Sequence, residues 1–355
     1  MVTQIRDLGV NLRGTPGAYN AITDVPGVTV GHHTIIKGKG QLTKGNGPIR
    51  TGITAILPRG TDLRPVFAAG YSLNGAGELT GMHWVEESGI LNGPICTTNT
   101  HSIGAVHEAI IEWMNQHDKA NNMPFCLPVV AETYDGFLND INGFHVRAEH
   151  VIKALESAST GKIKQGNVGG GTGMICHQFK GGIGSASRLV TTQNTACTLG
   201  VLVQANYGER DALIINGVPV GTEITTQMPT IESPEKSSII VIIACDAPLL
   251  PHQLKRLARR VPMGMAKVGS YAGNLSGDIF IAFSTANAIT QEKLVDLKML
   301  PNEHMEPLFK ATVEATEEAI LNALTAAETM TGINDATVYQ LPHDQVKALM
   351  AKYGR

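Results

Sequence analysis

The chain has 355 residues, of which 43% are hydrophobic and 17% charged, which is ordinary for a globular protein. Its net charge of −3, with no stripe of lysine and arginine, excludes nucleic acid and anionic membrane surfaces as expected partners. Five widely spaced cysteines without a C-x-x-C pair argue against a disulfide framework or a zinc knuckle. The N-terminus has no apolar core of a secretory signal, and no run of about 18 apolar residues occurs, so we expect a cytoplasmic protein.

The first third of the chain predicts strands followed by a helix. In residues 20–36 apolar and polar residues alternate, which predicts two short strands. A glycine- and lysine-rich hairpin tip follows, and residues 53–58 predict a further strand. His32 and His33 are adjacent, so on a strand they point to opposite faces and cannot chelate one metal. After a glycine-spaced segment, Ser102 is the expected N-cap of a helix.

The stretch 128–136 ends an apolar strand in a carboxylate, Glu132, and a phenol, Tyr134. Residues two apart on a strand face the same side, and strand ends are where sites are built. The alternative is a solvated turn at the end of the strand. A helix from about Val146 to Ser157 follows.

Residues 166–174 are rich in glycine but match neither the phosphate-loop nor the dinucleotide pattern. We expect a tight turn that lines a pocket. The next segments, 184–190 and 198–208, predict a hairpin of inner strands with Asn206 at its end. The Asn206 amide is suited either to donate to an oxyanion or to cap a turn.

The stretch around Ser238 is the most informative one. Residues 221–237 lack apolar periodicity and predict a mobile surface segment. Five consecutive β-branched residues, 239–243, then predict a strand buried on both faces. A mobile segment, a serine and a rigid strand, in this order, suit a chain that cuts itself.

The C-terminal third adds helper residues and helices. Asp246 and Pro248 predict the start of a helix. Ser276 and Asp278 stand where a glycine-rich turn enters another buried strand. The chain then predicts a helix of about 25 residues ending near Met330, and a short helix from about Val346 to Lys352.

Four stretches together resemble one family, the self-processing L-aminopeptidase/D-amidase-esterases and β-peptidyl aminopeptidases. They are AETYDG (131–136), QANYG (204–208), SIIVIIACDAPLLPHQL (238–254) and SGDIFIAFSTAN (276–287). The resemblance spans nearly the whole chain. It implies an α/β fold, a four-layer α/β/β/α sandwich similar to N-terminal nucleophile hydrolases with different strand connectivity.

The resemblance also implies a single catalytic domain, 1–355, that is cut between Ser237 and Ser238 into a larger chain, 1–237, and a smaller chain, 238–355. Such chains usually assemble as tetramers of the processed pairs. It implies no metal and no cofactor, and a small peptide or aminoacyl amide or ester with a free amine as the substrate.

Residue by residue, the resemblance assigns a role to each of six side chains. Ser238 is the nucleophile, Ser276 and Asp278 are its helpers, Glu132 holds the free amine of the substrate, and Tyr134 and Asn206 stabilise the oxyanion. The proton acceptor stays open between the α-amine freed at Ser238 and the Ser276/Asp278 pair, because no histidine is placed for the role.

Two positions depart from the family pattern. Ser237 stands where relatives often have Gly or Asn, so it is a competing hydroxyl next to the cut. Asp278 stands where some relatives have Glu, which shortens its reach by one methylene.

Three functions remain open from the sequence. The first is a self-activated serine exopeptidase or amidase that works through an acyl-enzyme on Ser238. The second is an acyltransferase of the ornithine acetyltransferase type, which is expected to use threonine as its nucleophile. The third is a non-catalytic protein that binds small molecules, in which Ser238 is only the first residue of a strand.

Overall fold

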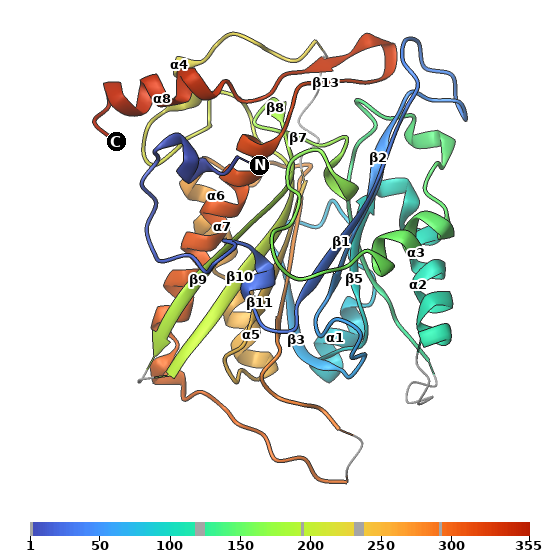
Figure 1. The fold of residues 1–355 in the computed structure, drawn as a ribbon, viewed down its shortest axis with the longest axis vertical. Coiled ribbons are helices and arrows are strands. Elements are labelled where there is room, and N and C mark those ends of the chain that lie inside the picture. The colour runs from blue at the N-terminus through green and yellow to red at the C-terminus, as the bar shows by residue number, and fades with distance from the viewer. Residues whose placement is uncertain (1–2, 118–124, 193–194, 231–237, 291–292) are drawn as a thin grey trace.

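The computed structural model describes residues 3–117, 125–192, 195–230, 238–290 and 293–355. In these residues the main strands form a four-stranded and a six-stranded sheet that stack face to face, with helices on the outer side of each (Figure 1). This order of layers is the α/β/β/α sandwich implied by the resemblance, so the prediction of the fold is confirmed.

The four-stranded sheet has the order β1 (Thr29–Lys37), β2 (Ile49–Leu57), β5 (Ile95–Asn99), β6 (Val129–Thr133). The six-stranded sheet has the order β4 (Ile90–Leu91), β3 (Val66–Ser72), β12 (Gly277–Ser284), β11 (Ser238–Cys245), β10 (Thr195–Asn206), β9 (Gly182–Thr192). Neighbouring strands are antiparallel except for the pairs β5–β6 and β11–β12, which are parallel.

Helices α2 (Ile103–His117) and α3 (Ala148–Glu156) cover the four-stranded sheet. Helices α5 (Pro251–Ala258) and α7 (Glu306–Ala326) cover the six-stranded sheet, and α6 (Val261–Lys267) packs against α7. The other helices are α1 (Met82–Ser88), α4 (Val220–Glu223) and α8 (His343–Lys352), and two small strand pairs join β7 (Ile175–Cys176) with β8 (Phe179–Lys180) and β13 (Met330–Thr331) with β14 (Thr337–Val338). No helix among these residues is long and apolar enough to span a membrane.

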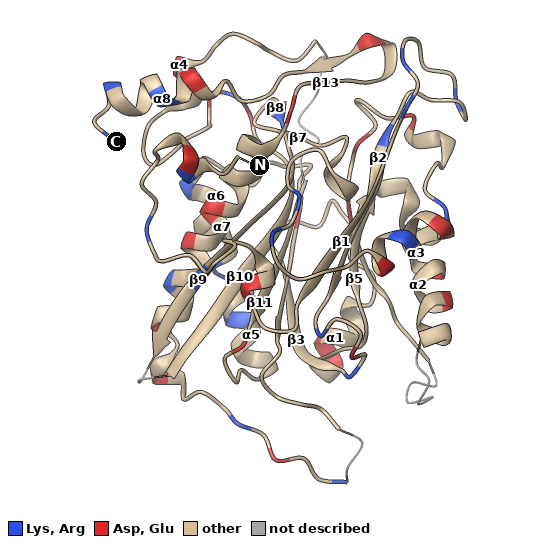
Figure 2. Ribbon diagram, in the orientation of Figure 1, with Lys and Arg blue, Asp and Glu red and all other residues tan. Residues whose placement is uncertain are grey.

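Strand β11 is buried along its whole length, as its β-branched run predicts. Ile239, Val241 and Ile243 belong to the apolar layer under α5 and α7, whereas Ile240 and Ile242 belong to the layer between the two sheets. Figure 2 shows the strands of both sheets almost free of charged residues, with lysine and arginine dispersed among aspartate and glutamate elsewhere. The charged neighbours of the strand, Asp278 and Asp246, therefore lie near its two ends.

The register of the six-stranded sheet brings residues that are distant in sequence together at one end of β10, β11 and β12. Ser238 is the first residue of β11; it pairs with Asn206 of β10 on one side and with Gly277 of β12 on the other. Ser276 directly precedes that glycine and Asp278 directly follows it. The backbone ladder thus places the predicted nucleophile beside three of the other predicted site residues.

The glycine-rich segment at 166–174 lies between the sheets as a 3₁₀ turn, Gly169–Gly171, with all three residues buried. A Cβ on Gly170 would stand 2.2 Å from the Gln204 side chain and 2.7 Å from the Thr97 carbonyl. Glycine is required here for close packing between the sheets. Of residues 166–174, Asn167 and Val168 help to line a surface hollow, whereas the three glycines of the turn do not.

Several predicted boundaries differ from the structure. Residues 20–36 form one strand, β1, after a 3₁₀ turn, and not two strands. The cap before α2 is Asn99, whose side chain accepts from the His101 N–H at 3.0 Å, so Ser102 is not the N-cap. Helix α7 has 21 residues and ends at Ala326 rather than near Met330.

The helix predicted to start at Asp246 starts instead at Pro251, with proline in its first turn. Asp246 is used in a tertiary contact: its carboxylate accepts from the Thr198 N–H at 2.6 Å. The carboxylate therefore holds the end of β11 to β10 and does not cap a helix.

The predicted mobile segment 221–237 starts inside α4. The guanidinium of Arg210 donates to the carbonyls of Ile224, Thr226 and Gln227 and so holds the first part of the segment. Residues 231–237 lie outside the described residues, so the mobility of the segment stays a prediction.

Truncating one side chain of β11 tests whether the strand is buried on both faces. Ile242→Ala is expected to lower the free energy of unfolding by about 2–5 kcal/mol, because Ile242 is 0% exposed and the sheets around it cannot close the cavity left by the side chain. The matched control is Leu189→Ala in β9, where the side chain is 54% exposed, with an expected change within about 0.5 kcal/mol. Denaturant unfolding of both variants measures the difference; equal losses would contradict the placement of β11.

Candidate active site

Ser238 is buried at the start of β11, a central strand of the six-stranded sheet, and backbone pairing fixes it on both sides. Its hydroxyl oxygen accepts a hydrogen bond from the Gly277 N–H at 3.2 Å. A Cβ on Gly277 would stand 2.6 Å from the Ala76 carbonyl, so the segment 73–78 packs directly onto this glycine. The hydroxyl is therefore held by a rigid piece of backbone.

Ser276 and Asp278 form a hydrogen-bonded pair beside Ser238. The Ser276 hydroxyl donates to Asp278 Oδ1 at 2.6 Å, and the Asn74 amide donates to Asp278 Oδ2 at 3.1 Å. Both oxygens of the carboxylate are thus engaged. Because the Ser276 proton points at Asp278, the Ser276 oxygen keeps its lone pairs to accept a proton from another group.

Glu132 is 3% exposed and is held by two donors. Its Oε1 accepts from the Glu78 N–H at 3.0 Å, and its Oε2 accepts a short hydrogen bond from the Thr100 hydroxyl. Burial raises the pKa of Glu132, and the hydrogen bonds from Thr100 and Glu78 oppose that rise. The carboxylate is therefore costly to keep charged without a cation beside it.

Tyr134 stands at the end of β6, two residues after Glu132 as predicted. Its ring packs edge-on against Phe137 at 5.3 Å between centroids. A Cβ on Gly136 would stand 2.4 Å from the Tyr134 hydroxyl, so this glycine leaves room for the phenol. Burial, and next the Asp135 charge, raise the pKa of Tyr134, which keeps the phenol protonated as a donor.

Asn206 holds the backbone that carries Tyr134. Its amide Nδ2 donates to the Tyr134 carbonyl at 3.1 Å, and its Oδ1 accepts from the Ile175 N–H at 2.8 Å. The structure therefore places Asn206 next to Ser238 in the ladder, with its side chain bonded to the backbone at Tyr134 and at Ile175 of β7.

These residues surround a cavity of about 410 Å³. Its described lining consists of Ala76, Gly77, Glu78, Thr100, Glu132, Tyr134, Ser238 and Leu275. Three of the six predicted site side chains thus line it, while Ser276, Asp278 and Asn206 stand behind. The two ionisable carboxyl groups in this lining are accompanied by no lysine, arginine or histidine.

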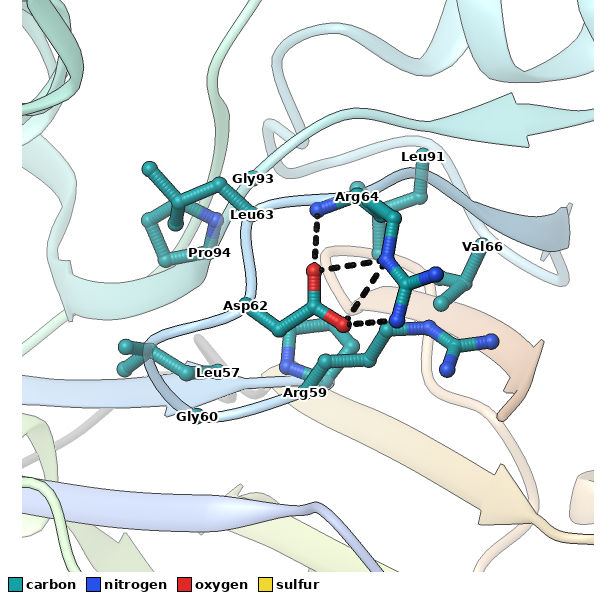
Figure 3. A pocket seen from close by; sticks show the side chains of 11 residues that line it. Leu57, Arg59, Gly60, Asp62, Leu63, Arg64, Val66, Leu91, Gly93 and Pro94 are labelled. Carbon is teal, nitrogen blue, oxygen red and sulfur yellow. Dashed lines mark hydrogen bonds and ion pairs between the residues drawn. The ribbon is translucent and has the colours of Figure 1, made fainter. Parts of the chain in front are cut away.

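A second hollow, drawn in Figure 3, lies beside β3 and is only about 10 Å³ in volume. The ion pair between Asp62 and Arg64, 2.6 Å apart, forms part of its lining. The hollow is too small for a substrate, and the charges of Asp62 and Arg64 pair with each other. The described residues that can hold a metal, Cys197, Cys245 and Asp246, lie at the other end of β11 from the candidate site.

The sequence did not point to several groups of the site. Asn74 and the Glu78 N–H come from the loop after β3, Thr100 comes from the 3₁₀ turn before α2, and the Gly277 N–H is a backbone group. The one available signal was the unusual glycine spacing of 70–81, which lets the loop approach the strands. Ser237, the other residue of the predicted cut, lies outside the described residues.

Comparisons with known proteins identify the family of this chain. Peptidase family S58 matches residues 20–338. This chain belongs to peptidase family S58. The S58 chain is 49% identical to the β-peptidyl aminopeptidase BapA of Sphingosinicella microcystinivorans, over 99% of this chain and 92% of that one.

Two solved structures resemble the S58 chain along nearly its whole length. The L-aminopeptidase D-Ala-esterase/amidase of Ochrobactrum anthropi, described as a new variant of the Ntn hydrolase fold, superposes with a TM-score of 0.94 at 46% identity, over 99% of each chain. The β-aminopeptidase of a Burkholderia species gives 0.91 at 45%, again over 99% of each chain. The resemblance drawn from the four stretches is therefore confirmed, and so is the variant Ntn-type fold. Membership of S58 also supports the exopeptidase over the acyltransferase and the binding protein.

The raised pKa of Glu132 predicts that this side chain destabilises the S58 fold above its own pKa. Because the pKa in the folded chain lies above the unfolded value of 4.5, the charged form costs stability at neutral and alkaline pH, and that cost disappears as the pH falls to the unfolded value. Glu132→Gln is therefore expected to raise the Tm at pH 8 and to match the parent near pH 4.

Thermal melts across this pH range measure the gap, with mass spectrometry confirming that both proteins are in the same state of processing. Glu87→Gln on the exposed side of α1 is the control and is expected to leave the Tm unchanged. A pH-independent gap for Glu132→Gln would contradict the interpretation.

Proposed function

We propose that this chain is a self-activated serine exopeptidase and amidase that releases N-terminal amino acids from short peptides, amides or esters. One observation carries the proposal: the cavity beside Ser238 also holds the buried carboxylate of Glu132 and has an acidic described lining. A cavity of this size suits one aminoacyl group and the bond that follows it.

Glu132 selects a free amine in this proposal. A substrate ammonium group would pair with a carboxylate that is already held by Thr100 and by the Glu78 N–H. A buried ion pair recovers the desolvation cost of both charges only when a partner is present. A peptide blocked at its N-terminus lacks that charge, which confines the enzyme to chain ends.

Ser238 is the proposed nucleophile. Its hydroxyl oxygen attacks the scissile carbonyl, its proton leaves to a base, and the amine or alcohol of the substrate departs with a proton. Water then attacks the ester on Ser238 and releases the amino acid. The proton acceptor is either the α-amine of a processed Ser238 or the Ser276 oxygen, which is backed by Asp278.

Tyr134 is the proposed oxyanion donor, because this residue lines the cavity and its phenol stays protonated. One such donor contributes about 2.7–4 kcal/mol to the lowering of the barrier. Asn206 is proposed to complete the oxyanion site with the second hydrogen of its amide, while the first is bonded to the Tyr134 carbonyl.

The same hydroxyl is proposed to cut the chain. Ser238 attacks the carbonyl of Ser237, an ester replaces the peptide bond as the amine is freed, and water hydrolyses the ester to leave a carboxylate on residue 237. The products are the chains 1–237 and 238–355. The position of Ser238 in a buried, rigid strand after the segment 221–237 supports this step.

We also propose that the enzyme is cytoplasmic and forms homo-oligomers. All five cysteines are free thiols, which suits a reducing compartment. The segment between β12 and α7 extends away from the body of the protein (Figure 1) and exposes Leu294, Leu297 and Met299, which suits contact with a second copy.

Replacing the nucleophile tests processing and activity together. Ser238→Ala is expected to give one uncut, inactive chain, whereas the parent gives two fragments of about two-thirds and one-third of its length. Intact mass spectrometry and a denaturing gel measure this. Ser237→Ala is the neighbouring control and is expected to be cut and active; if it stays whole while Ser238→Ala is cut, the nucleophile is misassigned.

Removing the amine anchor tests substrate selection. Glu132→Ala is expected to lower kcat/KM for L-alanyl p-nitroanilide by roughly 30-fold or more, since losing one partner of a buried ion pair costs about 2–5 kcal/mol. In the parent, kcat/KM is expected to fall on the acid side at a pH above the usual range of glutamate, because burial raises the pKa of Glu132.

The chemical control is N-acetyl-alanyl p-nitroanilide, which the parent is expected to leave uncut. β-Alanyl and D-alanyl analogues in the same panel identify the acyl group that the cavity prefers. Equal kinetics of the parent and Glu132→Ala on the free-amine substrate would remove Glu132 from amine binding.

A further inference from the structure

A cluster of two thiols and a carboxylate lies at the opposite end of β11 from Ser238. Cys245 is the last residue of β11, Asp246 follows it, and Cys197 lies in β10. One ligand atom from each side chain lies within 4.8 Å of the other two, which among the described residues is the one such group of three. The length of β11 separates this cluster from the nucleophile by roughly 23 Å.

We propose that Cys197, Cys245 and Asp246 bind a borderline-soft divalent cation, zinc in the cell, and that this cation ties β10 to β11. Two sulfur ligands and one carboxylate oxygen are donors that zinc takes in tetrahedral sites. The fourth position is left to water on the side of Asp246, which is partly exposed. Binding displaces the two thiol protons, so M²⁺ and two S–H groups give two M–S bonds and two H⁺.

Backbone groups already orient two of the three ligands. The Thr198 N–H donates to Asp246 Oδ1 at 2.6 Å, which leaves Oδ2 for a cation, and the Ala247 N–H donates to Cys245 Sγ at 3.3 Å. Donors of this kind hold metal ligands in place from behind.

The register favours a bridging cation over a disulfide. Cys245 pairs with Leu199, so Cys197 is its diagonal neighbour on the same face of the sheet. Diagonal positions are about 7–8 Å apart, at or beyond the reach of a disulfide between Cα atoms. Two Zn–S bonds of about 2.3 Å at a tetrahedral angle need sulfurs only roughly 3.8 Å apart, which agrees with the cluster.

The cation would also join the two products of the proposed cut, since Cys197 belongs to 1–237 and Cys245 to 238–355. This consequence rests on the proposed function, whereas the binding site does not. Metal binding and processing are measured separately, so failure of one is distinguishable from failure of the other.

Cd²⁺ is the probe, added to the reduced full-length protein. We expect one Cd²⁺ per chain by equilibrium dialysis, thiolate-to-metal charge-transfer absorbance, and a higher Tm with Cd²⁺ or Zn²⁺. Cys197→Ser is expected to weaken binding by about tenfold or more. Cys126→Ser is the matched control, because Cys126 packs against the layer under α2 and α3 and is expected to leave binding unchanged.

Asp246→Asn keeps both thiols and a partly exposed position, so it carries the test if Cys197→Ser does not fold; it is also expected to weaken binding by about tenfold. Circular dichroism checks the fold of each variant. The proposal is overturned if the parent takes up no stoichiometric Cd²⁺, or if a folded Cys197→Ser or Asp246→Asn variant binds as tightly as the parent.

Discussion

The burial of β11 on both faces is the constraint on which the rest of the molecule depends. A strand with no solvent on either side must satisfy its backbone groups in the sheet, and β10 and β12 do so along its whole length. The position of Ser238 is therefore set by two neighbouring strands and not by a loop. A reactive group built on such a scaffold is held within the fraction of an ångström that acyl transfer needs.

The carboxylates of Asp278 and Glu132 differ in their surroundings. Asp278 has both oxygens bonded by side chains, Ser276 and Asn74, within a buried relay. Glu132 also has two donors, but burial still raises its pKa, and it faces a cavity. The fold thus tolerates an unfavourable charge at the position where we propose that the substrate amine binds, which would be the usual exchange of stability for function at a binding site.

The sequence predicted what depends on local pattern and on strand ends. The β-branched run identified β11. The serine at its start, Glu132 near the end of β6 and Tyr134 just after β6 marked the site. It did not predict groups placed by packing: Asn74, Thr100 and the Gly277 N–H become part of the site only when loops close on strands. The same reason explains Asp246, whose local signal for a helix start lost to a tertiary contact with β10. Cys197 and Cys245 looked isolated because only the register brings them together.

The strand order of the six-stranded sheet has a consequence for a chain that is cut before Ser238. Strands β11 and β12 would belong to the smaller product, yet they lie in the middle of the sheet, flanked by β3 and β10 of the larger one. Strands of the two products would alternate in one sheet, so the products could dissociate on dilution only if the strand pairing of the sheet were lost. Each pair would then remain the two halves of one original molecule, without exchange of partners for as long as the fold lasts.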